Sequence, residues 1–272
     1  MIISIDPRGY CIEKSLNVYT DKNAEINTAL AIEQHKKLCA EINSKLLKSP
    51  NEKLPDLVFV ANCGLFLPRL PEKVVLLSDM KNCSRARETP YIERQLRSLG
   101  FKTIQFPKTE PFEGQGEALW FYDGRLLVVG YGYRSNKRTV KLLQRLLNQI
   151  YSAYGVEPPY VLGVKMTDPL FYHLDFAMLP ISPTKCIVHE GAISNLKQLR
   201  KYIKIYVIKT TDLFALNGIV LPDKVVVHKL KCARDKQFLE KHTQLPVVEI
   251  DLSEFEKSGG SVHCLLFNTF TA

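Results

Sequence analysis

A polar residue interrupts an otherwise apolar, β-branched stretch five times along this chain, at a spacing of roughly 40 to 60 residues. The interrupting residues are Asn62, Glu117, Asp175, Asn217 and Cys264. Four of the five share one order: a strand that carries the polar residue, a tight turn of the Asp-Gly, Pro-Asp or Pro-Thr kind, and a second apolar strand. An internal period of this length is typical of propellers and other repeat architectures.

Helical patterns follow some of these units. Leucines at i, i+3 and i+4 spacing predict helices over 139–150 and 195–203, and a further helical segment covers 24–42. Together the patterns predict an α/β fold in which strand–turn–strand units, followed by helices, are arranged about one axis. Each unit would then deliver one polar residue to a common central site.

Three segments supply an acid, a base and a thiol that such an arrangement would bring together. Glu113 lies in FEGQGE, His173 in FYHLD and Cys264 in SGGSVHC. A thiol becomes a nucleophile when a neighbour favours its thiolate, and a carboxylate orients the base. A lone cysteine is more often a small buried hydrophobe, so the prediction depends on the three groups together. His263 adjoins Cys264, but adjacent strand residues face opposite ways, which favours His173 as the base.

Composition limits the alternatives. The 272 residues contain no Ser/Gly/Pro-rich linker or low-complexity tract, which predicts a single domain over 1–272. The first residues lack the basic and apolar regions of a secretory signal, and no apolar stretch is long enough to span a bilayer, so we expect a soluble, cytoplasmic protein. Seven scattered cysteines without CxxC spacing argue against a disulfide framework and a zinc site, and we expect neither a metal nor a cofactor.

The formal net charge of +9 raises the question of nucleic-acid binding. The positive residues are spread along the chain, with local concentrations at 134–141 and 228–236 that are typical of exposed helix or loop faces. A solvated basic surface therefore explains the charge better than a nucleic-acid site does. Such a surface can also attract a substrate that carries a carboxylate.

An ordered set of segments resembles the pentein, or guanidine-group-modifying, superfamily, which contains arginine deiminase, dimethylarginine dimethylaminohydrolase, the amidinotransferases and the arginine dihydrolases. The segments are Asn17, PDLVFVAN (55–62), SRARE (84–88), FEGQGE (112–117), GYGYRSN (130–136), FYHLD (171–175) and SGGSVHC (258–264). The resemblance implies a five-bladed α/β propeller that forms one catalytic domain. It also implies a small guanidino substrate, and it leaves self-association open.

The resemblance assigns roles around the guanidinium group. Cys264 would be the nucleophile, His173 would transfer protons, and Glu113 would complete the triad. Asp175 would grip the cation, and if the segment were a strand it would point to the same side as His173, because side chains alternate with period two. Glu117 would contact substrate, although relatives usually carry Asp there.

Glycines flank both catalytic segments. Gly114 and Gly116 would let the backbone turn sharply or approach the ligand closely. Gly259 and Gly260 would give a flexible loop that closes over bound substrate.

The other end of an amino-acid substrate needs a carboxylate-binding group, and arginine suits this through its planar, bidentate fork. Arg85 and Arg134 fall where the superfamily places such arginines, with Arg87 a near competitor for Arg85. Asn17 would also bind substrate, because its spacing to Gln34 matches the N-terminal asparagine of the dihydrolase group.

Asn62 decides between activities within the superfamily. Similar deiminases and dimethylaminohydrolases place Asp there, whereas arginine dihydrolases have Asn in a segment like VFVAN. A first hydrolysis leaves a neutral ureido group, and an amide can donate to its oxygen where an ionised Asp cannot. The sequence therefore predicts an arginine dihydrolase that releases ornithine, ammonia and carbon dioxide. A deiminase, a dimethylarginine hydrolase, an amidinotransferase and a non-catalytic pentein remain as alternatives.

Overall fold

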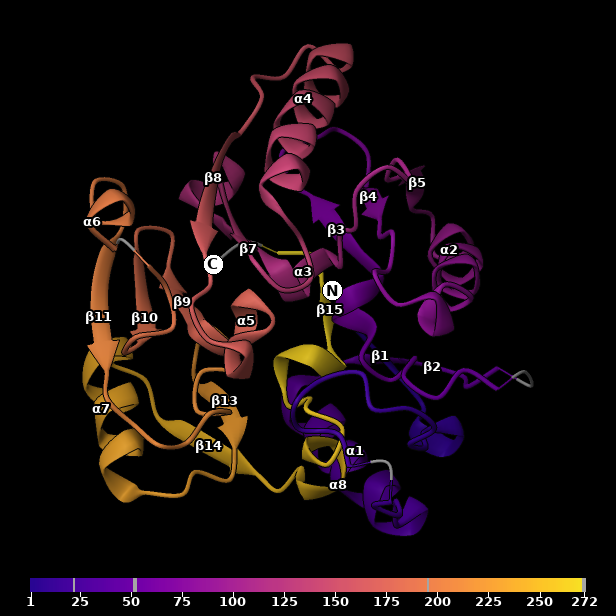
Figure 1. The fold of residues 1–272 in the computed structure, drawn as a ribbon, viewed down its shortest axis with the longest axis vertical. Coiled ribbons are helices and arrows are strands. Elements are labelled where there is room, and N and C mark those ends of the chain that lie inside the picture. Colours follow the sequence, from indigo (N-terminus) through magenta and orange to yellow (C-terminus); the bar gives the residue numbers. More distant parts are fainter. Residues whose placement is uncertain (22, 51–52, 195, 271–272) are drawn as a thin grey trace.

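The computed structural model describes residues 1–21, 23–50, 53–194 and 196–270, which form five three-stranded sheets around a central axis (Figure 1). In each sheet the first two strands in blade order are antiparallel, and the third is parallel to the middle one. A helix connects the two parallel strands, because a parallel pair needs a crossover. These are the five blades that the periodic pattern predicts.

The blades follow one another along the chain, and the first is completed by the C-terminal strand. Its parts are β15 (Phe267–Asn268), β1 (Ile2–Ile5), α1 (Thr28–Ile42) and β2 (Lys45–Leu47). The second contains β3 (Gly64–Leu67), β4 (Val74–Leu77), α2 (Glu88–Ser98) and β5 (Lys102–Gln105). The third contains β6 (Ala118–Phe121), β7 (Leu126–Tyr131), α4 (Lys137–Ala153) and β8 (Tyr160–Lys165).

The last two blades have the same order. The fourth contains β9 (Met178–Ser182), β10 (Lys185–His189), α6 (Leu196–Leu199) and β11 (Lys204–Ile208). The fifth contains β12 (Ile219–Val220), β13 (Val225–His228), α7 (Ala233–Thr243) and β14 (Val247–Ile250). Figure 1 shows α2, α4 and α7 at the periphery, with two short helices, α3 (Gly114–Glu117) and α5 (Leu174–Ala177), near the middle. None of the described helices is both long and apolar enough to cross a membrane.

The predicted helices are present, with different ends. The helix expected over 139–150 is α4, which begins after Asn136 because that side chain accepts hydrogen bonds from the N–H groups of Arg138 and Thr139. The helix expected over 24–42 begins only at Thr28, where Asn27 caps it. The prediction over 195–203 is too long, since α6 forms a single turn in which Leu199 is the buried residue, and residue 195 lies outside the described part.

The periodic polar residues do not lie on strands, which corrects the sequence prediction. Asn62 lies in the 3-10 helix Val60–Cys63, and Cys264 lies in the 3-10 helix His263–Leu265. Glu117 ends α3, Asp175 lies in α5, and Asn217 lies in a turn. Each therefore sits in a short turn just before the first strand of its blade. A short apolar run does not distinguish a strand from a buried helical turn, so the period is correct while the local structure is wrong.

Closure of the ring positions Cys264, the predicted nucleophile. β15 pairs antiparallel with β1 through Ile2 with Asn268 and Ile3 with Phe267, and Ile3 and Phe267 are fully buried. The last strand of the fold thus completes the blade that the first strand begins. Cys264, just before β15, consequently lies at the axis with the other four periodic residues.

Candidate active site

A narrow cavity brings together most of the predicted site residues. Cys264, His173, Asn62, Arg85, Arg134 and Asn17 all line it. Its other lining residues are Leu16, Thr20, Asp56, Phe59, Tyr172, Ser258 and Gly259. Glu113, Asp175 and Glu117 are buried and are not among the lining residues of this cavity. Glu113 contacts the lining residue His173, and Asp175 contacts the lining residue Cys264.

The Cys264 thiol is held between two side chains. It donates a hydrogen bond to Asp175 Oδ2 at 3.3 Å and accepts one from Asn217 Nδ2, also at 3.3 Å. The Cys264 N–H donates to Asn217 Oδ1 at 3.4 Å, so Asn217 holds both ends of the residue. Burial, and then the Asp175 carboxylate, raise the pKa of the Cys264 thiol well above its usual value. These surroundings favour the protonated form of the thiol.

His173 and Glu113 form a buried pair. His173 Nε2 lies 2.8 Å from Glu113 Oε2. Burial lowers the pKa of His173 to about 4, more than Glu113 raises it. Burial raises the pKa of Glu113, but Arg134 and His173 outweigh this and hold that pKa well below its usual value. A neutral imidazole must donate from Nε2 to the Glu113 carboxylate, which leaves Nδ1 as a proton acceptor.

Asp175 points toward the thiol, for a different reason from the one predicted. His173 is the extended residue that precedes α5, and Asp175 lies in the first turn of that helix, so the period-two argument is wrong. The helical turn directs His173 to Glu113 and Asp175 to Cys264. Burial raises the pKa of Asp175 to about 7, against the hydrogen bonds from Cys264 and Asn217.

Three buried polar atoms at this centre have no hydrogen-bond partner among the described residues. They are Asn62 Nδ2, His173 Nδ1 and Asp175 Oδ1. A Cβ added to Gly116 would lie 2.4 Å from Asn62 Nδ2 and 3.1 Å from His173 Nδ1, so the first two converge beside that glycine. Gly114 turns the same segment with a φ of +54°. One donor and two acceptors thus remain beside a buried thiol, and such groups normally require partners.

Two arginines and a carboxylate surround the outer part of the cavity. Arg134 donates from Nη2 to the Leu16 carbonyl oxygen at 2.9 Å and from Nη1 to Glu113 Oε1 at 3.5 Å, and it lies over the Tyr172 ring. In the described part of the chain, the other N–H groups of its guanidinium have no hydrogen-bond partner and could bind an anion. Asp56 lines the same space, and burial raises its pKa against the nearby arginines.

Arg85 differs from the sequence prediction. Its Nε and Nη2 groups donate to the buried Glu88 carboxylate, and its Nη1 group donates to Asn62 Oδ1 at 2.9 Å. The bidentate fork that we expected for a substrate carboxylate is therefore occupied by Glu88. The competitor Arg87 donates to the Lys53 carbonyl oxygen at an exposed position and does not line the cavity.

Asn17 joins the N-terminal segment to the loop before the nucleophile. Its Nδ2 donates to the Ser258 carbonyl oxygen at 2.8 Å, and its Oδ1 accepts from Tyr19 N. Gln34, whose spacing supported the assignment, instead donates to Ser253 Oγ and lies outside the cavity. Gly259 is buried in this loop, and a Cβ there would lie 2.7 Å from Asn17 Oδ1.

Gly260 is packed as tightly, because a Cβ on it would lie 2.1 Å from the Phe59 ring. The loop that was predicted to be flexible is therefore buried here, and its closing motion stays a prediction.

Glu117 does not reach the substrate cavity. Its carboxylate accepts hydrogen bonds from Ser135 N, Ser135 Oγ and Glu113 N. These hydrogen bonds hold the segment that carries Arg134 and the segment that carries Glu113 next to each other. Burial, and then the Glu113 charge, raise the pKa of Glu117 to about 8. This geometry supports the backbone around the site, and the predicted contact of Glu117 with substrate stays a prediction.

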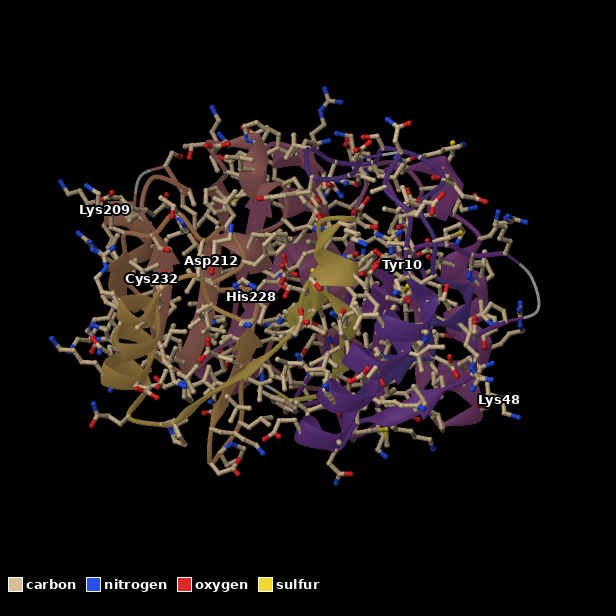
Figure 2. The ribbon with its side chains drawn as sticks, turned by 90° about the horizontal axis from the view of Figure 1, so that it is seen from below. Tyr10, Lys48, Lys209, Asp212, His228 and Cys232 are labelled. Carbon is tan, nitrogen blue, oxygen red and sulfur yellow. The ribbon has the colours of Figure 1, made fainter. Side chains whose placement is uncertain are left out.

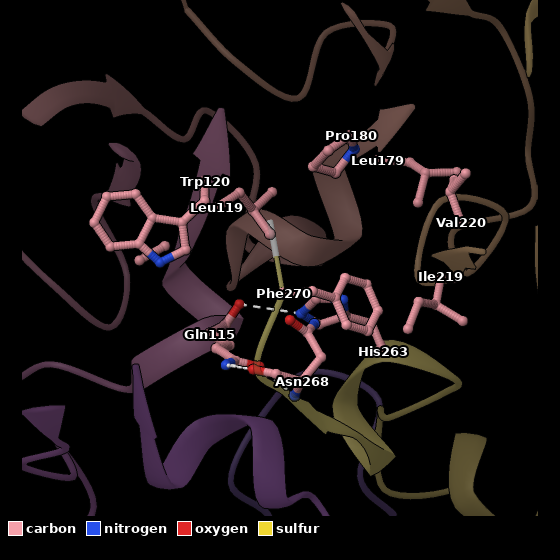
Figure 3. A pocket seen from close by; sticks show the side chains of 12 residues that line it. Gln115, Leu119, Trp120, Leu179, Pro180, Ile219, Val220, His263, Asn268 and Phe270 are labelled. Carbon is pink, nitrogen blue, oxygen red and sulfur yellow. Dashed lines mark hydrogen bonds between the residues drawn. The ribbon is translucent and has the colours of Figure 1, made fainter. Parts of the chain in front are cut away.

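His263 faces away from the nucleophile's cavity. Figure 3 shows its ring in a separate, largely apolar pocket, where Nε2 lies 3.2 Å from the Gln115 carbonyl oxygen. Burial lowers the pKa of His263 to about 4. The preference for His173 as the base agrees with this arrangement, although the adjacent residues belong to a 3-10 helix and not to a strand.

A buried ion-pair group supports the segment that leads to the nucleophile. His228 Nδ1 lies 2.7 Å from Glu256 Oε1, and Nε2 lies 3.0 Å from Asp212 Oδ1. Figure 2 shows Asp212 and His228 close together. Burial lowers the pKa of His228, but the two carboxylates outweigh it and raise that pKa to about 9. The imidazolium thereby ties the end of β13 to α8 (Ser253–Glu256), which precedes the glycine loop.

Three residues of the site have no predicted role: Asn217, Asp56 and Tyr172. Asn217 appeared in the periodic pattern, and its position there was a usable signal. Asp56 lies in the segment PDLVFVAN, six residues before Asn62, and Tyr172 lies beside His173, but nothing in their local patterns marked them. Within the described ranges, no three His, Cys, Asp or Glu side chains are grouped so that they could hold a metal ion.

Five three-stranded blades around a buried thiol, imidazole and carboxylates define a pentein, and comparisons with known proteins agree. The sequence model of the family described as N,N dimethylarginine dimethylhydrolase, eukaryotic, matches residues 11–271, so the chain belongs to this family.

Curated relatives include two cyanobacterial proteins and one mycobacterial protein. The bifunctional arginine dihydrolase/ornithine cyclodeaminase ArgZ of Synechocystis is 28% identical over 97% of this chain and 37% of its own length. The protein AgrE of Nostoc, with the same two activities in its name, is 32% identical over 80% of this chain and 30% of its own length. The dimethylarginine dimethylaminohydrolase of Mycobacterium tuberculosis is 24% identical over 95% of this chain and 82% of its own length. This chain thus spans about a third of the length of the two cyanobacterial relatives.

Solved structures show the same fold. The N-terminal domain of ArgZ bound to its substrate superposes with a TM-score of 0.87 at 27% identity, over 99% of this chain and 98% of that one. A dimethylarginine dimethylaminohydrolase adduct superposes with a TM-score of 0.75 at 18% identity, over 98% of each chain. The predicted five-bladed pentein architecture is confirmed.

Proposed function

We propose that this chain is a single catalytic domain that hydrolyses the guanidinium group of arginine through Cys264, and that it is an arginine dihydrolase. The observation that carries the proposal is the set of unpartnered atoms beside the thiol, which are the donor Asn62 Nδ2 and the acceptors His173 Nδ1 and Asp175 Oδ1. A guanidinium supplies N–H groups to the acceptors. A ureido group also supplies an oxygen to the donor.

The charges in the cavity fit the whole of arginine. The guanidinium would lie against Asp175, with its carbon above Cys264 Sγ. The α-carboxylate would accept from the free N–H groups of Arg134, and the Arg85 charge would support it. The α-ammonium group would lie by Asp56 and the Leu16 carbonyl oxygen, both of which face the same space.

The first hydrolysis begins when the cation arrives. Its positive charge lowers the pKa of the thiol, whose proton passes to His173 Nδ1. The thiolate attacks the guanidinium carbon, and the imidazolium, held by Glu113, returns the proton to a nitrogen that leaves as ammonia. His173 then takes a proton from water, which attacks the S-linked amidino carbon. The C–S bond breaks, which restores the thiol and leaves a ureido group.

The second hydrolysis repeats these steps on the ureido carbon. Asn62 Nδ2 donates to the ureido oxygen and keeps this intermediate in place, where an ionised carboxylate would repel it. Ammonia leaves again, water releases the carbamate, and the carbamate loses carbon dioxide to give ornithine. The atoms balance as arginine plus two water molecules giving ornithine, two ammonia molecules and one carbon dioxide.

The relatives support the reaction class, because ArgZ and AgrE carry arginine dihydrolase in their names. The family model supports a second candidate, hydrolysis of dimethylarginine. Asn62 favours the dihydrolase, since a second attack needs the donor that it offers. We also propose a cytoplasmic location, because a catalytic thiol needs a reducing compartment.

The test is a product analysis with two substrates. The protein is incubated with arginine or with dimethylarginine, and ammonia, dimethylamine, citrulline and ornithine are quantified. We expect about two ammonia molecules per ornithine from arginine, with little free citrulline, as successive hydrolysis in one site requires. Citrulline with one ammonia would make the protein a deiminase, and a preference for dimethylarginine would make it a dimethylaminohydrolase.

A further inference from the structure

We propose that Glu88 is a positioning residue that acts through Arg85 to set the orientation of the Asn62 amide. In this orientation, Asn62 Nδ2 can donate a hydrogen bond to a ureido oxygen at the catalytic centre. The inference rests on the proposed function and deepens it. It concerns the buried set Glu88, Arg85 and Asn62, which we call the orienting chain.

The first link of the orienting chain is a buried ion pair. Glu88 begins α2 and is 1% exposed. Its carboxylate accepts from Arg85 Nε at 2.9 and 3.0 Å and from Arg85 Nη2 at 2.7 Å. In the described part of the chain, the hydrogen bonds to this carboxylate all come from Arg85. A two-armed contact of this kind fixes the plane of the guanidinium as well as its place.

The second link, from Arg85 to Asn62, sets the orientation of the Asn62 amide. Arg85 Nη2 also donates to the Asp56 carbonyl oxygen at 3.1 Å, so Nη1 is the arm that remains, and it donates to Asn62 Oδ1 at 2.9 Å. A guanidinium donates and does not accept, so the amide must turn its oxygen toward Arg85. Asn62 Nδ2 therefore points the other way, toward Gly116 and His173, where it has no partner among the described residues.

Loss of the Glu88 charge would free the Arg85 guanidinium to move. The next negative charges that act on Arg85 are Asp56, which lines the cavity, and Glu113, which contacts the lining residue His173. An Arg85 that turns toward them withdraws Nη1 from the amide. Asn62 can then rotate, and its oxygen rather than Nδ2 would lie beside Gly116 and face toward the catalytic centre.

The affinities for arginine and for citrulline should respond differently to that rotation of Asn62. Arginine brings N–H groups to the centre and does not need the amide donor. Citrulline brings an oxygen and needs it. Both carry the same α-carboxylate, so a shift of Arg85 at that end affects them equally. The ratio of citrulline affinity to arginine affinity therefore isolates the orientation of Asn62.

The experiment measures this ratio by calorimetry in full-length Cys264→Ala protein, which binds without turnover. Glu88→Gln should lower the ratio about tenfold, the factor that 1.4 kcal/mol represents. Glu88→Asp, which keeps the charge, should restore most of it. Arg85→Lys should lower the ratio as Glu88→Gln does, because one ammonium group cannot reach both Glu88 and Asn62. Arg85→Lys therefore still tests the proposal if Glu88→Gln fails to fold.

Glu93→Gln is the matched control. Glu93 lies on the same helix, is partly buried and pairs with Arg97 at 2.7 Å, so its loss removes a glutamate–arginine ion pair outside the site. We expect the ratio to stay unchanged in this variant. In an Asn62→Asp background both oxygens of residue 62 accept, so Glu88→Gln should no longer change the ratio.

An unchanged ratio in both Glu88→Gln and Arg85→Lys would overturn the proposal. An equal fall with and without Asn62→Asp would also overturn it. The binding ratio does not depend on product identity. A wild type that releases only citrulline from arginine would therefore refute the dihydrolase function, and the orienting chain would still be tested by binding.

Discussion

Asn62→Asp is the substitution that tests the proposed chemistry most directly. One oxygen of the new carboxylate would still accept from Arg85 Nη1, as Asn62 Oδ1 does at 2.9 Å. The other oxygen would replace Nδ2, the buried donor that has no partner among the described residues. The change thus reverses one hydrogen-bonding role at the catalytic centre and leaves the size of the side chain nearly unchanged.

The expected effect follows from what each intermediate presents to residue 62. The guanidinium brings N–H groups and positive charge, so a carboxylate is acceptable and the first hydrolysis survives. The ureido group brings an oxygen that would lose its donor and face a second acceptor, at a cost of about 1 to 3 kcal/mol. A penalty of this size slows the second hydrolysis by roughly 5-fold to 150-fold.

The assay follows ammonia, citrulline and ornithine with time from arginine. Wild type should give about two ammonia molecules per ornithine, and Asn62→Asp should accumulate citrulline as its main product with one ammonia molecule for each. Circular dichroism before the assay checks that the variant is folded. If Asn62→Asp yields ornithine as fast as wild type, the reasoning about the donor is wrong, although the activity assignment stands.

Three further predictions concern the nucleophile, the carboxylate and the stability of the fold. Cys264→Ser should lose essentially all turnover and still bind arginine, because a hydroxyl lacks an accessible anion; calorimetry with a turnover assay checks both. Arg134→Ala should weaken arginine binding by roughly 2 to 5 kcal/mol, and wild type should turn over agmatine poorly; equal turnover would refute this role. The raised pKa of His228, about 9, adds up to about 3 kcal/mol of stability that is complete below pH 6.5 and lost as the pH rises through 9. Denaturant unfolding at both pH values should show a smaller decline for His228→Gln than for wild type.

The ring of blades was predictable because each blade repeats one sequence feature, a polar residue before its first apolar strand. Each unit has to place a polar residue at the axis before its first strand, so Asn62, Glu117, Asp175, Asn217 and Cys264 recur at similar spacing. The spacing reports that these residues face a common centre. It does not report their backbone conformation, because a buried helical turn and a buried strand of four residues have the same apolar composition.

The division of hydrogen bonds could not be predicted. Arg85 resembles a carboxylate-binding arginine in the sequence, but Glu88 stands one helical turn later and takes two of its N–H groups. Glu117 resembles a substrate carboxylate, but Ser135 and the Glu113 N–H occupy it. Which partner a buried group chooses depends on distances across the fold, and these are absent from local sequence patterns.

The two proposed hydrolyses would make opposite demands on one set of side chains. In the first step of the proposed reaction, the substrate's positive charge would lower the pKa of the Cys264 thiol, which burial and Asp175 raise, and the carboxylate of Asp175 would receive the cation. In the second, the ureido group is neutral and gives no such help. Asp175, with a pKa of about 7, can be protonated at this stage, which removes the negative charge next to Cys264. Asn62 cannot change its charge, so its orientation has to serve the second step from the start.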